Sequence, residues 1–255
     1  MNPLLFGTSK EPLFGVYHPP STSRTPGRGV VLCAPIGVEY MRTHRAVQKL
    51  AMQLARAGVH VFRFDYFGTG DSAGGSDAGT PSRWVQDIVL AAEELREHAR
   101  IKAVSLAGLR AGATLAAAAA REIGRLDRMV LWDPVVDGAA YVTEQLAQAT
   151  PGPGKDAVGV HGFPFPVRVQ EELRALDLTR LLFAGMAADT LLVISHDAVS
   201  YRTLSAAAAQ QGVAMTTRQI PSSGDWDDLD RLGAALMPQQ IIRGIVSWMA
   251  EEETP

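Results

Sequence analysis

The sequence predicts an α/β protein in which helices cover both faces of a mostly parallel sheet. Short apolar runs alternate along the chain with longer segments whose apolar residues have helical spacing. This alternation is typical of strand–helix–strand crossovers in a parallel sheet. The chain has 255 residues and 47% of them are hydrophobic, which is enough for one large domain with a sizeable core.

Strands are predicted where an apolar run is short and bounded by turn residues. The run G-V-V-L-C-A-P from Gly29 is continuous, as expected of a strand that is buried on both faces. The predicted strands are 12–17, 29–35, 59–64, 103–109, 128–132, 191–195 and 214–220.

Helices are predicted from apolar spacing and from residues that start or stop a helix. Gly58 stops the first, and Thr80 and Ser82 around Pro81 are cap candidates for the second. The predicted helices are 43–57, 82–99, 112–123, 200–210 and 230–251, the last bent or restarted at Pro238.

One long segment interrupts the alternation. Between Pro134 and Asp189 there is no convincing strand, and two pieces rich in proline and glycine accompany helical patterns at 141–149 and 169–176. Long insertions of this kind are usually functional or disordered. We expect residues 1–134 and 190–255 to form the core domain and residues 135–189 a helical lid over the strand ends. The alternative is a stabilising cap that contacts no substrate.

Composition excludes several classes of function. A net charge of −3 gives no basic surface for nucleic acid. The N-terminus has no signal-peptide pattern, and the longest apolar stretch is broken at Arg121, too early for a membrane span. Cys33 is the single cysteine, and no Cys/His cluster suggests a metal. We therefore expect a cytoplasmic protein with a small-molecule ligand and with no metal, cofactor or nucleic-acid partner. The sequence does not indicate its oligomeric state.

The stretch Gly108-Leu109-Arg110-Ala111-Gly112 joins a predicted strand to a predicted helix. Its G-x-R-x-G form matches the tight turn G-x-S-x-G, which presents a nucleophilic serine, and in which the next N–H helps to bind an oxyanion. In this chain the central residue is Arg110, whose guanidinium stays protonated near neutral pH and cannot attack a carbonyl.

Other stretches strengthen the likeness. The loop F-D-Y-F-G-T-G-D-S from Phe64, the turn C-A-P-I-G from Cys33 and V-I-S-H-D from Val193 follow three predicted strands. With these motifs the chain resembles the α/β-hydrolase superfamily over essentially its whole length. The stretches A-P-I-G-V-E-Y-M-R-T-H-R from Ala34 and L-W-D-P-V-V-D-G from Leu131 are similar to hydrolase-like proteins linked to bacterial exosortase A systems. The resemblance implies the fold strongly and an activity weakly.

The resemblance implies a serine, a histidine and an acid, and two of these are missing here. The acid position matches Asp197. In the stretch Q-I-P-S-S-G-D-W, Gly224 stands where the histidine is expected, and no histidine follows His196. Ordinary hydrolysis by a Ser-His-Asp triad is therefore not expected. His196 is the best remaining candidate for a general base.

A relocated triad is an alternative. Ser72, Ser222 and Ser223 are the serines that follow predicted strands. Ser105 lies within a predicted strand, and Cys33 is expected to be a core residue rather than a nucleophile.

Two readings of Arg110 stay open. In the first, a carboxylate of Glu39, Asp133 or Asp197 neutralises it as a structural ion pair. In the second, its partner is a ligand anion, bound with the N–H groups of Ala111 and of Ile36 or Gly37. The catalytic candidates are Arg110, Asp197 and His196, and the ligand-binding candidates are Ile36, Gly37, Glu39, Tyr40, Leu109, Ala111 and Asp133.

The polar run from Glu39 to Arg45 has two interpretations. Tyr40, Arg42 or His44 contacts the substrate, or the run is a solvated helix start capped by Thr43.

Three classes of function follow. The protein is an enzyme with non-hydrolytic chemistry, an inactive fold that binds an anionic or acyl ligand, or an interaction module in an exosortase-linked pathway. The first two predict an open pocket with an accessible Arg110. The third predicts a filled pocket in which Arg110 is tied to a carboxylate.

Overall fold

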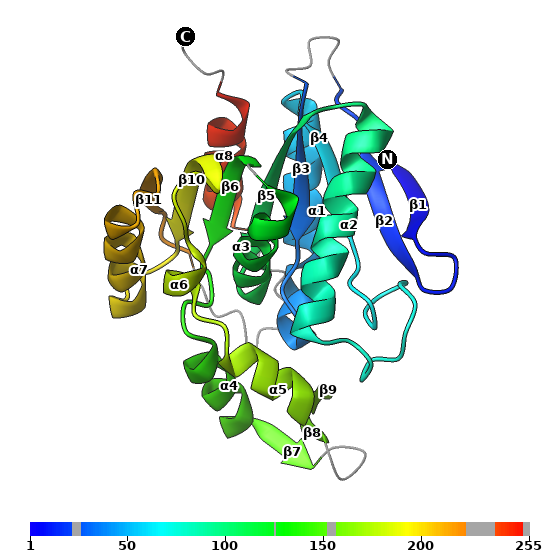
Figure 1. Ribbon diagram of the computed structural model, residues 1–255, viewed down its shortest axis with the longest axis vertical. Helices are drawn as coiled ribbons and strands as arrows, with labels where there is room; N and C mark the ends of the chain where they lie inside the picture. The colour runs from blue at the N-terminus through cyan, green and yellow to red at the C-terminus, as the bar shows by residue number, and fades with distance from the viewer. Residues whose placement is uncertain (22–26, 125, 152–156, 223–237, 252–255) are drawn as a thin grey trace.

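An eight-stranded sheet organises the protein (Figure 1). The computed structural model describes residues 1–21, 27–124, 126–151, 157–222 and 238–251. The strand order is β1-β2-β4-β3-β5-β6-β10-β11, and all pairs from β4 onward are parallel, whereas β1, β2 and β4 pair antiparallel. The predicted mostly parallel sheet is confirmed.

Every predicted strand is present, and one strand of the main sheet was missed. The strands of the sheet are β1 (Asn2–Gly7), β2 (Pro12–His18), β3 (Arg28–Cys33), β4 (His60–Phe64), β5 (Ala103–Leu109), β6 (Leu126–Trp132), β10 (Ala187–Ile194) and β11 (Met215–Gln219). The missed strand is β1, an edge strand in which only Phe6 is buried. Its conformation depends on pairing with β2, so its own sequence shows little of the apolar pattern of a strand.

Helices cover both faces of the sheet. They are α1 (Gly37–Arg56), α2 (Pro81–Ala99), α3 (Ala111–Ile123), α7 (Val199–Gln210) and α8 (Gln239–Ala250). Alternate residues of β3 point to opposite faces. Val31 packs in the core cluster that includes residues of α2 and α3, and Val30 in the cluster that includes residues of α1 and α8. No helix in the described part of the chain is long and apolar enough to cross a membrane.

Three details of the predicted helices need correction. The first helix begins at Gly37 rather than at residue 43, so Thr43 is not its cap but donates from Oγ1 to the carbonyl oxygen of Glu39 at 2.7 Å. The run from Glu39 to Arg45 resembles a helix start because charged residues are typical of solvated caps. Thr80 is the cap of α2, and Ser82 is not. Pro238 precedes α8, and residues 230–237 of the predicted last helix lie outside the described residues.

The segment between β6 and β10 contains strands, contrary to prediction. It consists of α4 (Gly138–Ala147), β7 (Ala149–Pro151), β8 (Ala157–Val160), β9 (Phe163–Pro166), α5 (Val167–Arg174) and α6 (Leu178–Leu181). The strands β7, β8 and β9 form a small antiparallel sheet. Strand β9 was not predicted because it contains Pro164 and Pro166, and proline is unfavourable inside a sheet. Proline is tolerated here because β9 is an edge strand. Figure 1 shows α4, α5 and β7–β9 gathered below one end of the main sheet.

Candidate functional site

Arg110 lies at the tip of the turn between β5 and α3. Its backbone has φ 54° and ψ −126°, a region that residues other than glycine rarely adopt. Neighbouring backbone holds it there, because Arg110 donates from its N–H to the oxygen of Trp132 at 3.0 Å and accepts from the N–H of Val135 at 3.3 Å. A strained conformation that is fixed on both sides is typical of a functional turn.

The two glycines of this turn allow close packing. A Cβ atom on Gly112 would lie 2.3 Å from the carbonyl oxygens of Cys33 and Ala34, and one on Gly108 would lie 2.3 Å from the Cα of Ala113. Glycine is needed because none of these backbone atoms can move away easily. The first turn of α3 therefore lies against the residues that lead from β3 into α1.

Glu39 is the carboxylate that neutralises Arg110. The two side chains form an ion pair of 2.8 Å between Arg110 Nε and Glu39 Oε1, and Glu39 is only 1% exposed. Tyr141 of α4 donates to Glu39 Oε2 at 3.3 Å, and Arg110 also donates to the backbone oxygen of Asp133 at 3.3 Å. Burial opposes the charge of Arg110, but the Glu39 carboxylate outweighs it, so the pKa of Arg110 lies above its ordinary value.

Asp133, at the end of β6, is a buried carboxylate with one unbonded oxygen. Its Oδ1 accepts from the N–H of Ser195 at 2.7 Å, whereas Oδ2 has no hydrogen-bond partner among the described residues. Burial raises the pKa of Asp133 above its usual value. The ionised form is therefore less favourable in the folded protein than in the unfolded chain.

We expect Asp133→Asn to stabilise the protein at neutral pH. The raised pKa means that the ionised carboxylate destabilises the fold once the pH rises above that of free aspartate, about 3.9. Asparagine keeps an oxygen for Ser195 and removes the charge, for an expected gain on the order of 1 kcal/mol at pH 7. This gain should shrink as the pH falls through the raised pKa. Urea unfolding between pH 4 and pH 8 measures it.

The matched control for this variant is Asp197→Asn. Asp197 is exposed and pairs with Arg202, so its amide should change stability by less than about 1 kcal/mol. A loss of stability at pH 7 in Asp133→Asn would contradict the assignment of Asp133 as a group that is unfavourably ionised.

The structure places the other two predicted catalytic residues at the end of β10. Asp197 forms its ion pair with Arg202 of α7, and no contact joins it to Arg110 in the described part of the chain. His196 is exposed, and its Nδ1 lies 3.2 Å from Ser195 Oγ. Their catalytic roles stay predictions. The described residues contain no group of three or more His, Cys, Asp or Glu side chains that could hold a metal ion.

Ser72, an alternative nucleophile, and Ser105, predicted to be a buried strand residue, both make hydrogen bonds to backbone groups. Ser72 Oγ donates to the backbone oxygen of Asp65 at 2.5 Å and accepts from the N–H of Phe14 at 2.9 Å. Ser105 is fully buried and accepts from the N–H of Arg128 at 3.2 Å. The bonds of Ser72 hold the loop after β4 against β2, and the bond of Ser105 links β5 to β6. Ser222 is half-buried, and Ser223 and Gly224 lie outside the described residues.

A cavity of about 200 Å³ opens at the N-terminus of α1, beside the ion pair. None of the described residues that line it has a charged side chain. Core residues of its wall are Ile36, Gly37, Val38, Tyr40, Gly68, Thr69, Gly70, Ser76, Gly79 and Trp84. Residues between β6 and β10 that line it are Tyr141, Gln145, Val160, Phe163, Pro164, Phe165, Pro166 and Val169.

The predicted ligand-binding residues divide between the cavity and the Arg110 turn. Ile36, Gly37 and Tyr40 line the cavity, whereas Glu39, Leu109, Ala111 and Asp133 do not. Tyr141 and Gln145 of α4 also line the cavity, and neither was predicted as a site residue. Tyr201 of α7 was not predicted either. Burial raises its pKa, the nearby Asp133 carboxylate raises it further, and Arg110 lowers it.

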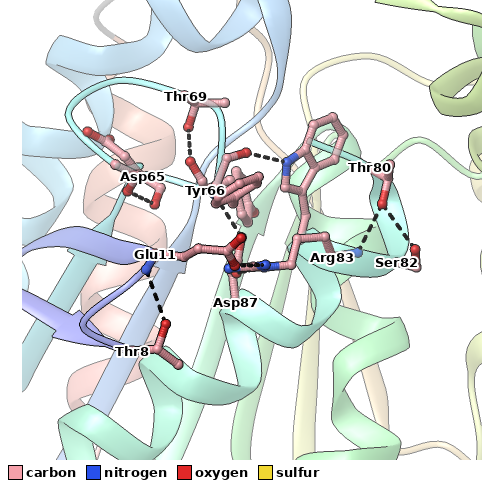
Figure 2. Close-up of polar contacts among 12 residues, drawn as sticks. Thr8, Glu11, Asp65, Tyr66, Thr69, Thr80, Ser82, Arg83 and Asp87 are labelled. Atoms are coloured by element: carbon pink, nitrogen blue, oxygen red, sulfur yellow. Dashed lines mark hydrogen bonds and ion pairs between the residues drawn. The ribbon is translucent and has the colours of Figure 1, made fainter. Parts of the chain in front are cut away.

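Hydrogen bonds stabilise the wall that follows β4. Tyr40 donates to Asp65 Oδ1 at 2.7 Å, and burial, followed by this bond, raises the pKa of Tyr40, which keeps the phenol neutral. Figure 2 shows Thr69 bonded to the backbone of Tyr66, at 2.8 Å, and Asp87 facing Arg83. These bonds give the cavity a preformed shape.

Comparisons with known proteins agree with this architecture. The family model described as serine aminopeptidase, S33, matches residues 25–201. Est1E of Butyrivibrio proteoclasticus, solved with ferulic acid bound, has a TM-score of 0.68 at 16% identity, with 97% of this chain and 100% of that chain covered. A proline iminopeptidase of Mycobacterium smegmatis has a TM-score of 0.66 at 13% identity, with 97% of each chain covered.

A serine hydrolase without a lid from Xanthomonas campestris is also similar. Its TM-score is 0.60 at 18% identity, with 100% of this chain and 96% of that chain covered. At these identities the likeness shows the fold alone. No curated protein sequence matches the chain.

Proposed function

Because this chain belongs to the serine aminopeptidase S33 family of α/β hydrolases, we propose that it binds an acyl-type small molecule in its cavity without serine chemistry. The single observation that carries the proposal is the Arg110–Glu39 ion pair at the turn where a hydrolase of this fold presents its nucleophile. A guanidinium cannot attack a carbonyl, and one that is paired with a buried carboxylate has no free charge to offer.

The backbone groups near the turn support binding of a carbonyl oxygen. Ala111 begins α3 and Gly37 begins α1, and the first N–H groups of a helix have no partner within the helix. The packing of Gly112 against Ala34 brings these two helix starts together. Such donors can polarise a carbonyl without a nucleophile, so any reaction at this site would be non-hydrolytic.

The lining of the cavity favours an uncharged acyl group over an anion. An anionic ligand would need a free cation, but the described part of the chain places no charged side chain in the lining, and Arg110 is held by Glu39. Est1E, which shares this fold, is known with ferulic acid bound. This supports an aromatic body for the ligand, whereas the absence of charge is inferred from the lining of this cavity.

The interaction-module alternative is less well supported. Arg110 is tied to Glu39, as the interaction module requires and contrary to the accessible Arg110 expected of a binding protein or enzyme. The interaction module also requires a filled pocket, whereas a cavity of about 200 Å³ is open. Residues from α4, β9 and α5 line that cavity, which supports the proposal that residues 135–189 are a lid on the core formed by 1–134 and 190–255. The exosortase link and the cytoplasmic location stay predictions.

We expect the Val169→Trp variant to lose ligand binding. Val169 is a buried residue of α5 in the cavity wall, and an indole there would fill the space. The wild-type protein should bind methyl cinnamate without turning it over, and the variant should bind it at least about tenfold more weakly. Saturation-transfer NMR and calorimetry measure binding, and circular dichroism confirms folding.

The matched control is Val199→Trp, the same substitution at an exposed position of α7. It should bind like the wild type. Unchanged binding in a folded Val169→Trp variant would place the ligand elsewhere and contradict the proposal.

A further inference from the structure

Gln145 is a buried side chain of the cavity that has no hydrogen-bond partner. It lies on α4, is 7% exposed, and lines the cavity. Its side-chain amide makes no hydrogen bond to any described residue. A carboxamide has two donor hydrogens and an acceptor oxygen, and the Gln145 amide is not among the fully buried unpaired groups of the described residues, so it is open to the cavity. It can therefore bond to a ligand that enters the cavity and displaces water.

Apart from the exposed Ser76, the other polar side chains of the cavity lining already have partners. Tyr40 donates to Asp65, and Tyr141 donates to Glu39. Thr69 donates to the backbone of Tyr66, and Trp84 donates to that of Phe67. Their hydrogens are therefore used within the protein. Gln145 differs from them because both its donors and its acceptor are available to a ligand.

The apolar part of the cavity wall indicates the chemistry of the rest of the ligand. Phe163, Pro164 and Phe165 of β9 and Trp84 of α2 line the cavity. Aromatic and proline surfaces of this kind pack well against a flat apolar body. At about 200 Å³, the cavity suits a fragment-sized molecule.

We propose that Gln145 selects an uncharged ligand that carries a carboxamide on a small apolar body. This proposal rests on the proposed function, because it concerns the ligand of the same cavity. An amide offers a donor and an acceptor side by side and can satisfy both sides of the Gln145 side chain. An ester offers acceptors alone and leaves the Gln145 oxygen unpaired. A carboxylate would bring a charge into a wall that has no cation.

The test compares three probes of similar size: cinnamamide, methyl cinnamate and cinnamate. Calorimetry measures their dissociation constants with the wild type and with Gln145→Leu, which keeps the size of the side chain and removes its amide. Gln145→Met serves if the leucine variant does not fold. Gln210→Leu is the control, since Gln210 is exposed on α7 and remote from the cavity lining.

We expect the wild type to bind cinnamamide about tenfold more tightly than methyl cinnamate, and cinnamate more weakly than either. In Gln145→Leu the preference for the amide over the ester should disappear, and in Gln210→Leu it should persist. If the wild type binds amide and ester equally, or if the preference survives in Gln145→Leu, this inference is overturned and the proposed function stands. If the wild type binds none of the three probes, both are overturned.

Discussion

The Arg110→Ala variant is expected to lose about 3–5 kcal/mol of stability. Arg110 is 18% exposed in its side chain and its partner Glu39 is 1% exposed. Alanine would leave the Glu39 carboxylate buried, with the Tyr141 hydroxyl as its one remaining side-chain donor among the described residues. A single buried charge without its counterion is strongly destabilising, whereas loss of a surface ion pair has little effect.

A double-mutant cycle separates the ion pair from simple loss of packing. Arg110→Met combined with Glu39→Leu removes both charges and keeps most of the volume, so the double variant should be more stable than either single variant. Arg202→Ala, which breaks the exposed pair with Asp197, is the surface control and should cost less than about 1 kcal/mol. If Arg110→Ala loses no more stability than this control in urea unfolding, the buried Arg110–Glu39 ion pair does not stabilise the fold as described above.

The Arg110→Ser variant should gain no esterase activity, although it restores the serine of the turn. A serine needs a base to remove its proton, and no histidine follows His196 in the chain. His196 is exposed and has Ser195 as its hydrogen-bond partner. In a triad hydrolase, loss of the serine or the histidine alone lowers kcat by about 10⁶-fold. The serine variant should therefore turn over esters no faster than the wild type.

The elements of the core could be predicted because their signals are local. The continuous apolar run of β3 and the amphipathic spacing of α2 depend on residues close together in the sequence. Strand β1 and the small sheet of β7, β8 and β9 were missed, because these short strands depend on their pairing partners rather than on a strong apolar pattern. The early start of α1 was missed because its first turn carries Glu39, whose burial is set by Arg110 and Tyr141.

The site was predictable only in part. The glycine spacing around Arg110 indicated the turn, but three carboxylates were equally plausible partners in the sequence. The choice of Glu39 depends on the reach of two side chains from β5–α3 and α1. Tyr141 and Gln145 lie on α4, in the segment between β6 and β10, where the sequence contains no recognisable motif. One signal was present, since Gln145 falls three residues after Val142 and four after Tyr141, on the buried face of α4.

The most direct test of whether this protein works without a serine nucleophile is a rate measurement. Purified wild-type protein and the Arg110→Ser variant are each given a panel of short and long acyl esters and acyl thioesters, and initial rates are compared with a blank without protein. We expect both proteins to match the blank on every substrate. Turnover by the wild type above the blank would contradict the proposal and would mean that another residue, with Ser222 the first to substitute, acts as the nucleophile.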